Sequence, residues 1–197
     1  ASNLSNKVES LWSGLNEVRT SLFHETNNKL RQLNSFVDEI RTLNQKIFET
    51  GTIGIDPSNL KDRRDEVVEE LSKLANINLS EDDQGSYNIS IGGVFATDRY
   101  YAHKFEAKIE NDRIAFSTKD GVIVNIQGGE LNALSSLYNE KIPSYQKRID
   151  DIAITLMDNV NAIHASGFNL KNPPVTGVNF FDGYSKGKLS INQDILD

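Results

Sequence analysis

The sequence predicts an α+β fold that is mostly α-helical: an elongated antiparallel helical bundle with a small inserted antiparallel β-meander. Apolar residues recur at helical spacing through roughly the first quarter of the 197-residue chain. Strand-like alternation replaces this spacing between residues 77 and 127, and the helical spacing returns after residue 128. We therefore expect residues 1–76 and 128–197 to form a helical shaft domain with an extended C-terminal segment, and residues 77–127 to form an inserted antiparallel β-region.

A single long helix is predicted for residues 4–47. Its apolar residues form a narrow stripe with intervals of three and four, which is typical of a coiled-coil seam. The stripe consists of Leu4, Val8, Leu11, Leu15, Val18, Leu22, Leu30, Leu33, Phe36, Ile40, Leu43 and Ile47. Between Leu22 and Leu30 it is interrupted, and Thr26 occupies a position where an apolar residue is expected. A helix of this length needs partner helices to cover the stripe.

A second helix follows a short connection. Gly51 and Gly54 end the first helix, and Asp56 is the expected N-cap of the second, with Pro57 in its first turn. The second helix extends to about Ala75 and has one apolar face, made of Leu60, Val67, Val68, Leu71 and Leu74. The short connection predicts that this helix packs antiparallel to the first.

The β-region is predicted to contain roughly four to six strands, as expected for period-two alternation between turns. Its expected turns are Asp82-Asp83-Gln84-Gly85, Gly92-Gly93, Asn111-Asp112 and Asp120-Gly121. Gly128-Gly129 marks the corner into the next helix.

A return helix is predicted from Leu131 to Ile163, where Pro143 should kink it or divide it in two. Gly167 is well placed to end it. Beyond Phe168 we expect an extended segment, which Phe180 and Phe181 attach to the bundle.

Composition excludes several classes of function. The net charge of −7 argues against binding to nucleic acid, whose phosphates require a basic surface. No stretch is apolar enough to cross a bilayer. The chain contains no cysteine, which excludes disulfides, thiolate catalysis and cysteine metal sites. Two interpretations of this absence stay open: chance in a bacterial protein, or passage of the unfolded chain into an oxidising exterior.

Residues with catalytic or metal-binding chemistry are scattered. His24, His103 and His164 lie in three different predicted elements, and none has a second histidine at metal-ligand spacing. The glycine pairs do not belong to a phosphate-binding loop, and the carboxylates of Asp150-Asp151 are expected to be solvated charges on a polar helix face. We therefore predict no catalytic, cofactor-binding or metal-binding residues, no cofactor and no enzyme activity.

One charged cluster, Asp62-Arg63-Arg64-Asp65, lies within the amphipathic second helix. Arg64 is close to the apolar side of that helix. It is either part of a solvated patch or a buried or half-buried arginine that bridges helices through its fixed fork of donors.

The same helix begins a series of motifs that continues in order along nearly the whole chain. They are Asn59-Leu60-x-Asp62-x-Arg64-Asp65 with Leu71-Ser72-x-Leu74, Tyr87-Asn88-Ile89-x-Ile91-Gly92-Gly93, Gly128-Gly129-Glu130-Leu131-x-Ala133-Leu134, Pro143-x-Tyr145, Ile149-Asp150-x-Ile152-Ala153, Val160-Asn161-x-Ile163-His164-x-x-Gly167, and Phe180-Phe181 with Leu189-Ser190-Ile191-Asn192. This series resembles the flagellar hook-associated protein 1 family, and it covers the central body of that family without its terminal segments.

The resemblance implies a structural axial protein of the bacterial flagellum at the hook–filament junction. Such a protein would be secreted unfolded by the flagellar type III apparatus. It would contact the flagellar hook protein and the adjacent junction protein, and in its full-length form it would self-assemble into a ring. No nucleic acid or membrane partner is implied, and the present chain, without terminal segments, is expected to be a monomer. The alternatives are another axial protein (the second junction protein, the cap or a flagellin-like protein) and a non-flagellar coiled-coil adaptor.

Overall fold

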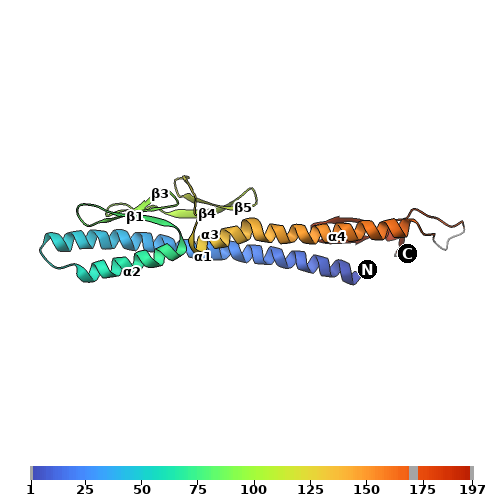
Figure 1. The fold of residues 1–197 in the computed structure, drawn as a ribbon, viewed down its shortest axis with the longest axis horizontal. Helices are drawn as coiled ribbons and strands as arrows, with labels where there is room; N and C mark the ends of the chain where they lie inside the picture. Colours follow the sequence, from blue (N-terminus) through green and yellow to red (C-terminus); the bar gives the residue numbers. More distant parts are fainter. Residues whose placement is uncertain (1, 169–172, 196–197) are drawn as a thin grey trace. The chain divides into compact units, whose positions relative to one another are not determined.

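The computed structural model describes residues 2–168 and 173–195. Its elements, in chain order, are α1 (Ser2–Thr52), α2 (Ser58–Leu74), β1 (Ile77–Glu81), β2 (Tyr87–Ile91), β3 (Val94–Thr97), β4 (Phe105–Glu110), β5 (Arg113–Thr118), β6 (Ile123–Val124), α3 (Gly129–Ser136), a π-helical segment (Leu137–Lys141), α4 (Ile142–Ala165), β7 (Phe181–Ser185), β8 (Lys188–Ile191) and a 3₁₀ turn (Gln193–Ile195) (Figure 1). The predicted class, a mostly helical α+β fold, is confirmed.

The chain forms two compact units. Unit 1 comprises residues 1–20 and 140–197, and unit 2 comprises residues 21–139. Helix α1 contributes its first part to unit 1 and the rest to unit 2. This division by packing is separate from the predicted division into helical and β segments, which stays a prediction.

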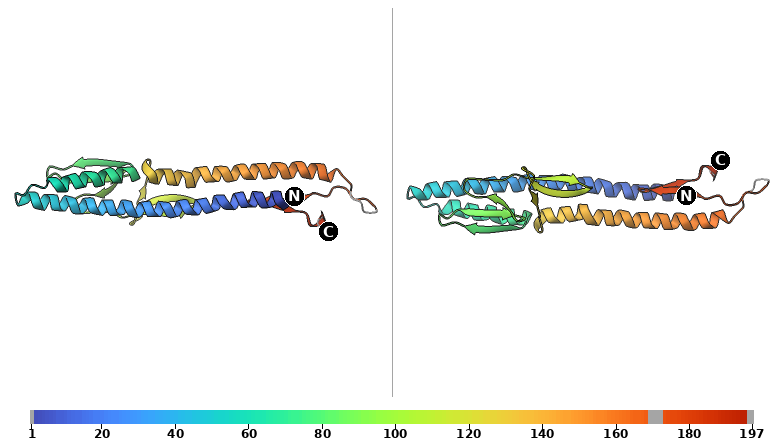
Figure 2. Two further views of the ribbon diagram at one scale, coloured as in Figure 1. Left: turned by 90° about the horizontal axis from the view of Figure 1, so that it is seen from below. Right: turned by 90° about the horizontal axis from the view of Figure 1, so that it is seen from above.

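The two N-terminal helices are close to the prediction. Helix α1 continues to Thr52, and α2 runs back beside its later part (Figures 1 and 2). The predicted N-cap was wrong by one residue, because Pro57 rather than Asp56 occupies that position. Asp56 still stabilises the start of α2, since its Oδ1 accepts hydrogen bonds from the backbone N–H of Ser58 at 3.1 Å and from its hydroxyl at 2.6 Å.

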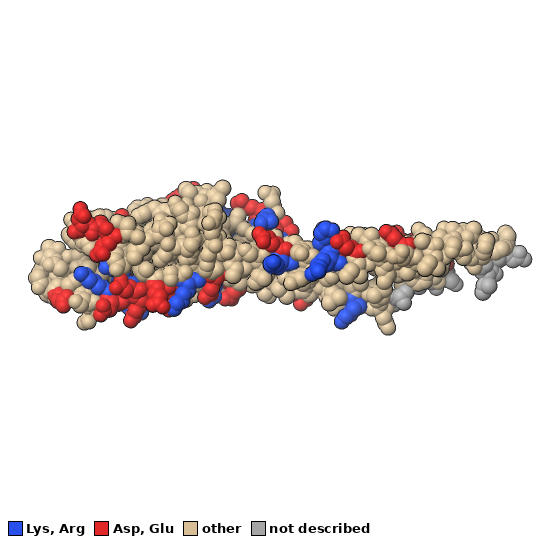
Figure 3. Space-filling model, in the orientation of Figure 1, with Lys and Arg blue, Asp and Glu red and all other residues tan. Residues whose placement is uncertain are grey.

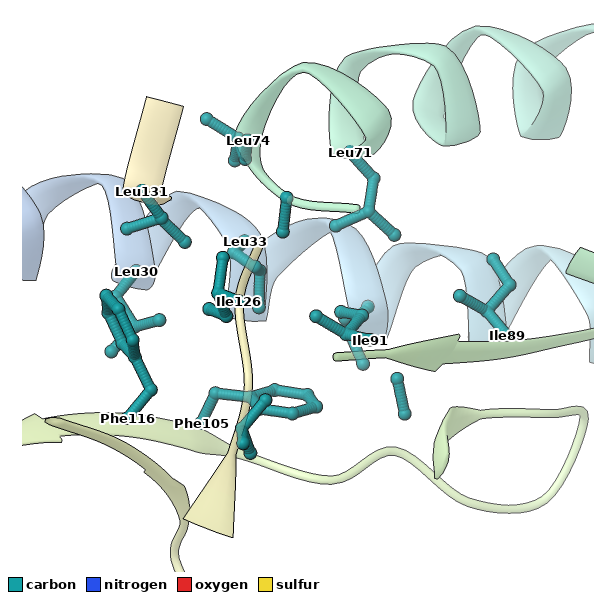
Figure 4. Packing of buried hydrophobic residues seen from close by; sticks show 14 of the residues in the cluster. Leu30, Leu33, Leu71, Leu74, Ile89, Ile91, Phe105, Phe116, Ile126 and Leu131 are labelled. Atoms are coloured by element: carbon teal, nitrogen blue, oxygen red, sulfur yellow. The ribbon is translucent and has the colours of Figure 1, made fainter. Parts of the chain in front are cut away.

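Unit 2 has one hydrophobic core, shown in Figure 4. Leu33 and Ile40 of α1 are completely buried in it, and Ile47 is 5% exposed. The core combines this part of α1 with side chains from α2, the strands and α3, among them Leu71, Ile91, Phe105, Phe116 and Leu131. The stripe of α1 is thus covered here by strands as well as by helices.

The inserted β-region forms two separate three-stranded sheets, where the sequence predicted one meander. Sheet A has the order β1-β2-β3 and sheet B the order β4-β5-β6, with all pairs antiparallel. The loop after β3 folds back to form a bridge from Ala102 to Thr97, the last residue of β3, and β3 and β4 belong to different sheets. The predicted turns at Gly92-Gly93 and Asn111-Asp112 are present, with positive φ at all four residues.

Asparagine side chains of helices form paired hydrogen bonds with the backbone of strands. Asn34 of α1 accepts from the N–H of Phe105 and donates to its C=O, both at 2.8 Å. Asn44 of α1 forms the same pair with Tyr87 in sheet A, at 3.1 and 2.8 Å. Asn139 does so with Ile114 of β5, and Asn161 of α4 with Phe181 of β7. Each amide therefore satisfies one donor and one acceptor of a strand, which a helix backbone cannot do.

Gly129 allows α3 to begin against the end of α2. Its φ is +74°, and a Cβ at this position would lie 2.5 Å from the carbonyl carbon of Leu74. Only glycine combines this backbone conformation with so close an approach. The predicted corner at Gly128-Gly129 is thus confirmed.

Pro143 divides the return helix, as predicted. It lies at the start of α4, immediately after the π-helical segment that follows α3. Proline lacks an N–H and its ring clashes with the carbonyl four residues earlier, so a wider turn relieves the helix at this point. Asn139, within that turn, forms the pair of bonds to Ile114.

The C-terminal segment of unit 1 is more regular than predicted. Residues 181–191 form a hairpin of β7 and β8, where the sequence predicted only an extended segment. Phe181 is 3% exposed, which agrees with its expected attachment role. Gly187 of the hairpin packs against Trp12 of α1, since an added Cβ would lie 2.4 Å from the Trp12 Cβ. Residues 169–172 and 196–197 of the predicted extended segment lie outside the described residues.

The apolar stripe of α1 is only partly covered in unit 1. Leu4, Leu11 and Val18 are 40–49% exposed, although partner helices were predicted to cover the stripe. Unit 1 covers α1 with α4 and one hairpin, whereas unit 2 provides α2 and two sheets. The expectation of a fully covered stripe is therefore correct for unit 2 and wrong for unit 1.

We predict that Leu33→Ala lowers the free energy of unfolding by about 2–5 kcal/mol, because it removes a completely buried side chain and leaves a cavity. The control is Leu11→Ala in the same stripe, which is 49% exposed and should cost much less. Urea unfolding followed by circular dichroism measures both. Equal losses for the two variants would contradict the packing of α1 in unit 2.

Candidate functional site

Arg64 is buried between three elements of unit 2. It is 1% exposed, and its Nη1 donates to Oδ1 of Asn44 in α1 at 2.9 Å and to the carbonyl of Gly85, in the turn after β1, at 2.7 Å. The guanidinium carbon lies 3.4 Å from the centroid of the Tyr87 ring. Of the two interpretations drawn from the sequence, the buried arginine that bridges helices is confirmed by its bond from α2 to α1, and the contact with the turn after β1 was not predicted.

The partners of Arg64 are oriented by further hydrogen bonds. The hydroxyl of Tyr87 donates to Oδ1 of Asp65 at 2.8 Å. Burial, together with this bond, raises the pKa of Tyr87 above its ordinary value. Arg64 has polar and aromatic neighbours rather than a carboxylate of its own, so the group fixes how α1, α2 and the β1–β2 turn meet. Its role is structural, as for other buried charged groups that specify an arrangement.

Unit 1 contains a comparable contact between α4 and the hairpin. The hydroxyl of Tyr184 donates to Asp150 and accepts from the backbone N–H of Gly187 at 2.9 Å. Burial, followed by the bond to Asp150, raises the pKa of Tyr184 to about 12. Asp150 is therefore a hydrogen-bond acceptor of the hairpin and not the solvated charge that the sequence predicted. Its neighbour Asp151 is exposed and pairs with Lys147 at 2.9 Å.

The three histidines lie in three different elements of the chain. His24 is exposed on α1, and His103 lies in the loop before β4. His164, at the end of α4, packs against Phe180 and has its Nδ1 2.7 Å from the carbonyl oxygen of Val178. Across residues 2–168 and 173–195, no group of three or more His, Cys, Asp or Glu side chains is arranged to hold a metal ion. Nor is any helix of the described chain long and apolar enough to cross a membrane.

Sequence reasoning missed several of the residues that organise these contacts. Asn34 and Asn44 follow Leu33 and Leu43 directly in the stripe, and a small amide beside a core residue was the available signal. Tyr184 gave no signal, because nothing local in the sequence pairs it with Asp150. Thr26 was noted as an interruption; it is completely buried, and its hydroxyl donates to the carbonyl of Leu22 at 2.8 Å.

These observations define the class of protein: a helical structural domain with small attached sheets, whose buried polar groups serve to join its elements. Comparison with known proteins then gives the family. Residues 1–181 match the family described as the flagellar hook-associated protein FlgK helical domain, and the chain belongs to that family. The resemblance found in the sequence is thereby confirmed.

Individual relatives agree with this assignment. The chain is 26% identical over 189 residues to flagellar hook-associated protein 1 of Escherichia coli strain K12, an alignment that covers 84% of this chain and 34% of the relative. It is 20% identical over 224 residues to the protein of the same name from Bacillus subtilis strain 168, covering 93% of this chain and 44% of the relative. The chain thus spans less than half the length of either relative.

The fold is also found in a solved structure. The flagellar hook junction protein FlgK from Burkholderia pseudomallei matches with a TM-score of 0.80 at 20% sequence identity. The match covers 92% of this chain and 34% of that protein. At this identity the similarity establishes a shared fold.

We predict that Arg64→Met is tolerated better than Arg64→Ala, because methionine keeps an apolar stem that fills the buried space. Thermal unfolding should give the order wild type, Arg64→Met, Arg64→Ala. The matched control is Arg63→Ala, since Arg63 is exposed and pairs with Glu39 and Glu66 at the surface. A midpoint for Arg64→Ala as high as that of Arg63→Ala would show that the buried contacts do not stabilise the fold.

Proposed function

We propose that this chain is the helical domain of a structural axial protein at the hook–filament junction of the bacterial flagellum. The observation that carries the proposal is the match of residues 1–181 to the FlgK helical domain, with the corresponding fold over 92% of the chain. Its action is assembly with other subunits, and it has no enzymatic step. In line with this, the side chains of Arg64 and Tyr184 form hydrogen bonds that join elements of the fold.

The exposed apolar residues of unit 1 support an assembly role. Besides Leu4, Leu11 and Val18 on α1, Ile152 and Ile163 on α4 are 67% and 76% exposed. Exposed apolar residues on helices with coiled-coil spacing favour packing against further helices. A protein that acts through subunit contacts has a use for such surfaces.

The proposal includes the partners and location of the whole protein. It contacts the flagellar hook protein on one side and the adjacent junction protein on the other, and it forms a ring in its full-length form. It reaches the exterior through the flagellar type III apparatus, and the absence of cysteine suits an unfolded chain that enters an oxidising environment. Residues 1–76 and 128–197 serve as the helical shaft, and residues 77–127 as the inserted β-region.

Deletion of the gene should leave cells with hooks that carry no attached filaments, because the protein that joins the hook to the filament is missing. Electron microscopy of the cells measures this, and the full-length gene supplied in trans is the control that restores the filaments. Normal filaments on the hooks of the deletion strain would contradict the proposed function.

We further expect the isolated 197-residue chain to be monomeric at micromolar concentration. The stripe of α1 is buried within unit 2, and the net charge of −7 adds repulsion between copies at low salt. Light scattering over a concentration series tests this. A stable dimer that Ile152→Asp dissociates would instead show that the uncovered face of α4 is sufficient for self-association.

A further inference from the structure

Strand β3 and the loop that follows it present aromatic side chains on the surface of unit 2. Tyr100 is 75% exposed, Tyr101 60% and Phe95 40%. The ring of His103 lies between two of them, with its centroid 5.2 Å from that of Tyr101 and 5.9 Å from that of Phe95. We call these four residues the aromatic patch. Exposed tyrosines grouped in this way are characteristic of protein interaction sites.

Hydrogen bonds and a cation–π contact order the backbone and one ring of the aromatic patch. Oδ1 of Asp98 accepts hydrogen bonds from the backbone N–H groups of Tyr100 at 2.6 Å and Tyr101 at 2.7 Å. The guanidinium of Arg99 lies 4.0 Å from the ring centroid of Phe48 on α1, and it donates to the hydroxyl of Tyr100 at 2.7 Å. A surface that is already ordered loses less conformational entropy when it binds a partner.

Acidic residues lie near the aromatic patch on two segments of the chain, one of which also carries Lys119. Arg99 also donates to the side chain of Gln84, which follows the acidic residues Glu81, Asp82 and Asp83 in the β1–β2 turn. Asp and Glu side chains gather beyond the end of β1 in Figure 3. On another side, the Asp120 carboxylate is 77% exposed and lies 3.9 Å from Nδ1 of His103. Arg99 itself is only 8% exposed, so its positive charge is largely hidden from a partner.

Exposed aromatic rings next to carboxylates favour binding of a positively charged group. The faces of tyrosine and phenylalanine rings attract ammonium and guanidinium groups, and the neighbouring carboxylates add to that attraction. We propose that the aromatic patch binds an arginine- or lysine-bearing surface of a neighbouring flagellar protein. The inference rests on the proposed function and identifies the contact surface that this function requires. A contact between two such patches on separate copies would bring like charges together, which disfavours a second copy presenting the same face.

The test measures binding of the whole gene product to purified hook protein and to purified adjacent junction protein of the same bacterium. Tyr100→Ala/Tyr101→Ala should weaken binding to one of them by about tenfold or more. Tyr100→Phe/Tyr101→Phe keeps both rings and should bind nearly as wild type does. Asp83→Asn/Asp120→Asn should weaken binding mainly at low salt, where surface charges are least screened. Tyr145→Ala removes a 49%-exposed tyrosine from α4 in unit 1 and serves as the matched control.

The outcomes separate this inference from the proposed function. If the wild-type protein binds a flagellar partner and the double alanine variant binds it equally well, the aromatic patch is not the contact surface and the proposed function stands. If the wild-type protein binds neither partner, the proposed function fails, and this inference fails with it. Circular dichroism of each variant establishes that it is folded. Loss of binding in Tyr145→Ala equal to that in the double variant would also overturn the assignment.

Discussion

The structure depends on a problem of hydrogen bonding: strands must be attached to helices whose own backbone groups are already paired. Four asparagine side chains solve it, each by one donor and one acceptor bond to a single strand residue. Asn34 and Asn139 both attach sheet B, at Phe105 and Ile114. Small sheets of two or three strands are marginal in isolation, so these joints, together with the core beneath them, are what keep the sheets in place. Asn44 extends the principle, because the same amide that binds Tyr87 also accepts from Arg64.

Helix α1 belongs to both units, but its apolar stripe is covered to a different extent in each. In unit 2 the stripe of α1 is buried, with Leu33, Val37 and Ile40 each completely enclosed. In unit 1 the same periodicity leaves Leu11 about half exposed. The spacing of apolar residues therefore indicates where another element can pack against α1. Only some of these positions are covered by other parts of this chain. An assembling protein can leave the remainder for its neighbours.

Much of the fold was available from the sequence because it depends on local periodicity. The presence of α1 and α2, the turn at Gly92-Gly93 and the division of the return helix at Pro143 all follow from nearby residues. The separation into two sheets was not predictable, because it depends on which strand pairs with which, and the irregular loop between them resembles a turn in sequence. The β7–β8 hairpin was missed because its partners, Trp12 and Asp150, lie far away along the chain. The sequence left the burial of Arg64 as one of two alternatives. Its spacing places Arg64 near the apolar face of α2, but it does not show whether other elements supply hydrogen-bond acceptors there.

The contiguity of unit 2 has a consequence for the order in which the molecule forms. Residues 21–139 follow one another without interruption, so their core can be completed as soon as that stretch of chain is free. Unit 1 is discontinuous: its first 20 residues must wait for residues after 140 before α1 gains α4 and the hairpin beside it. When synthesis or export proceeds from the N-terminal side, the start of α1 therefore emerges before the rest of these 197 residues, yet it is among the last of them to find its partners. During that interval it is a bare helix-forming segment, held to the rest only by its continuity with a unit that is already folded.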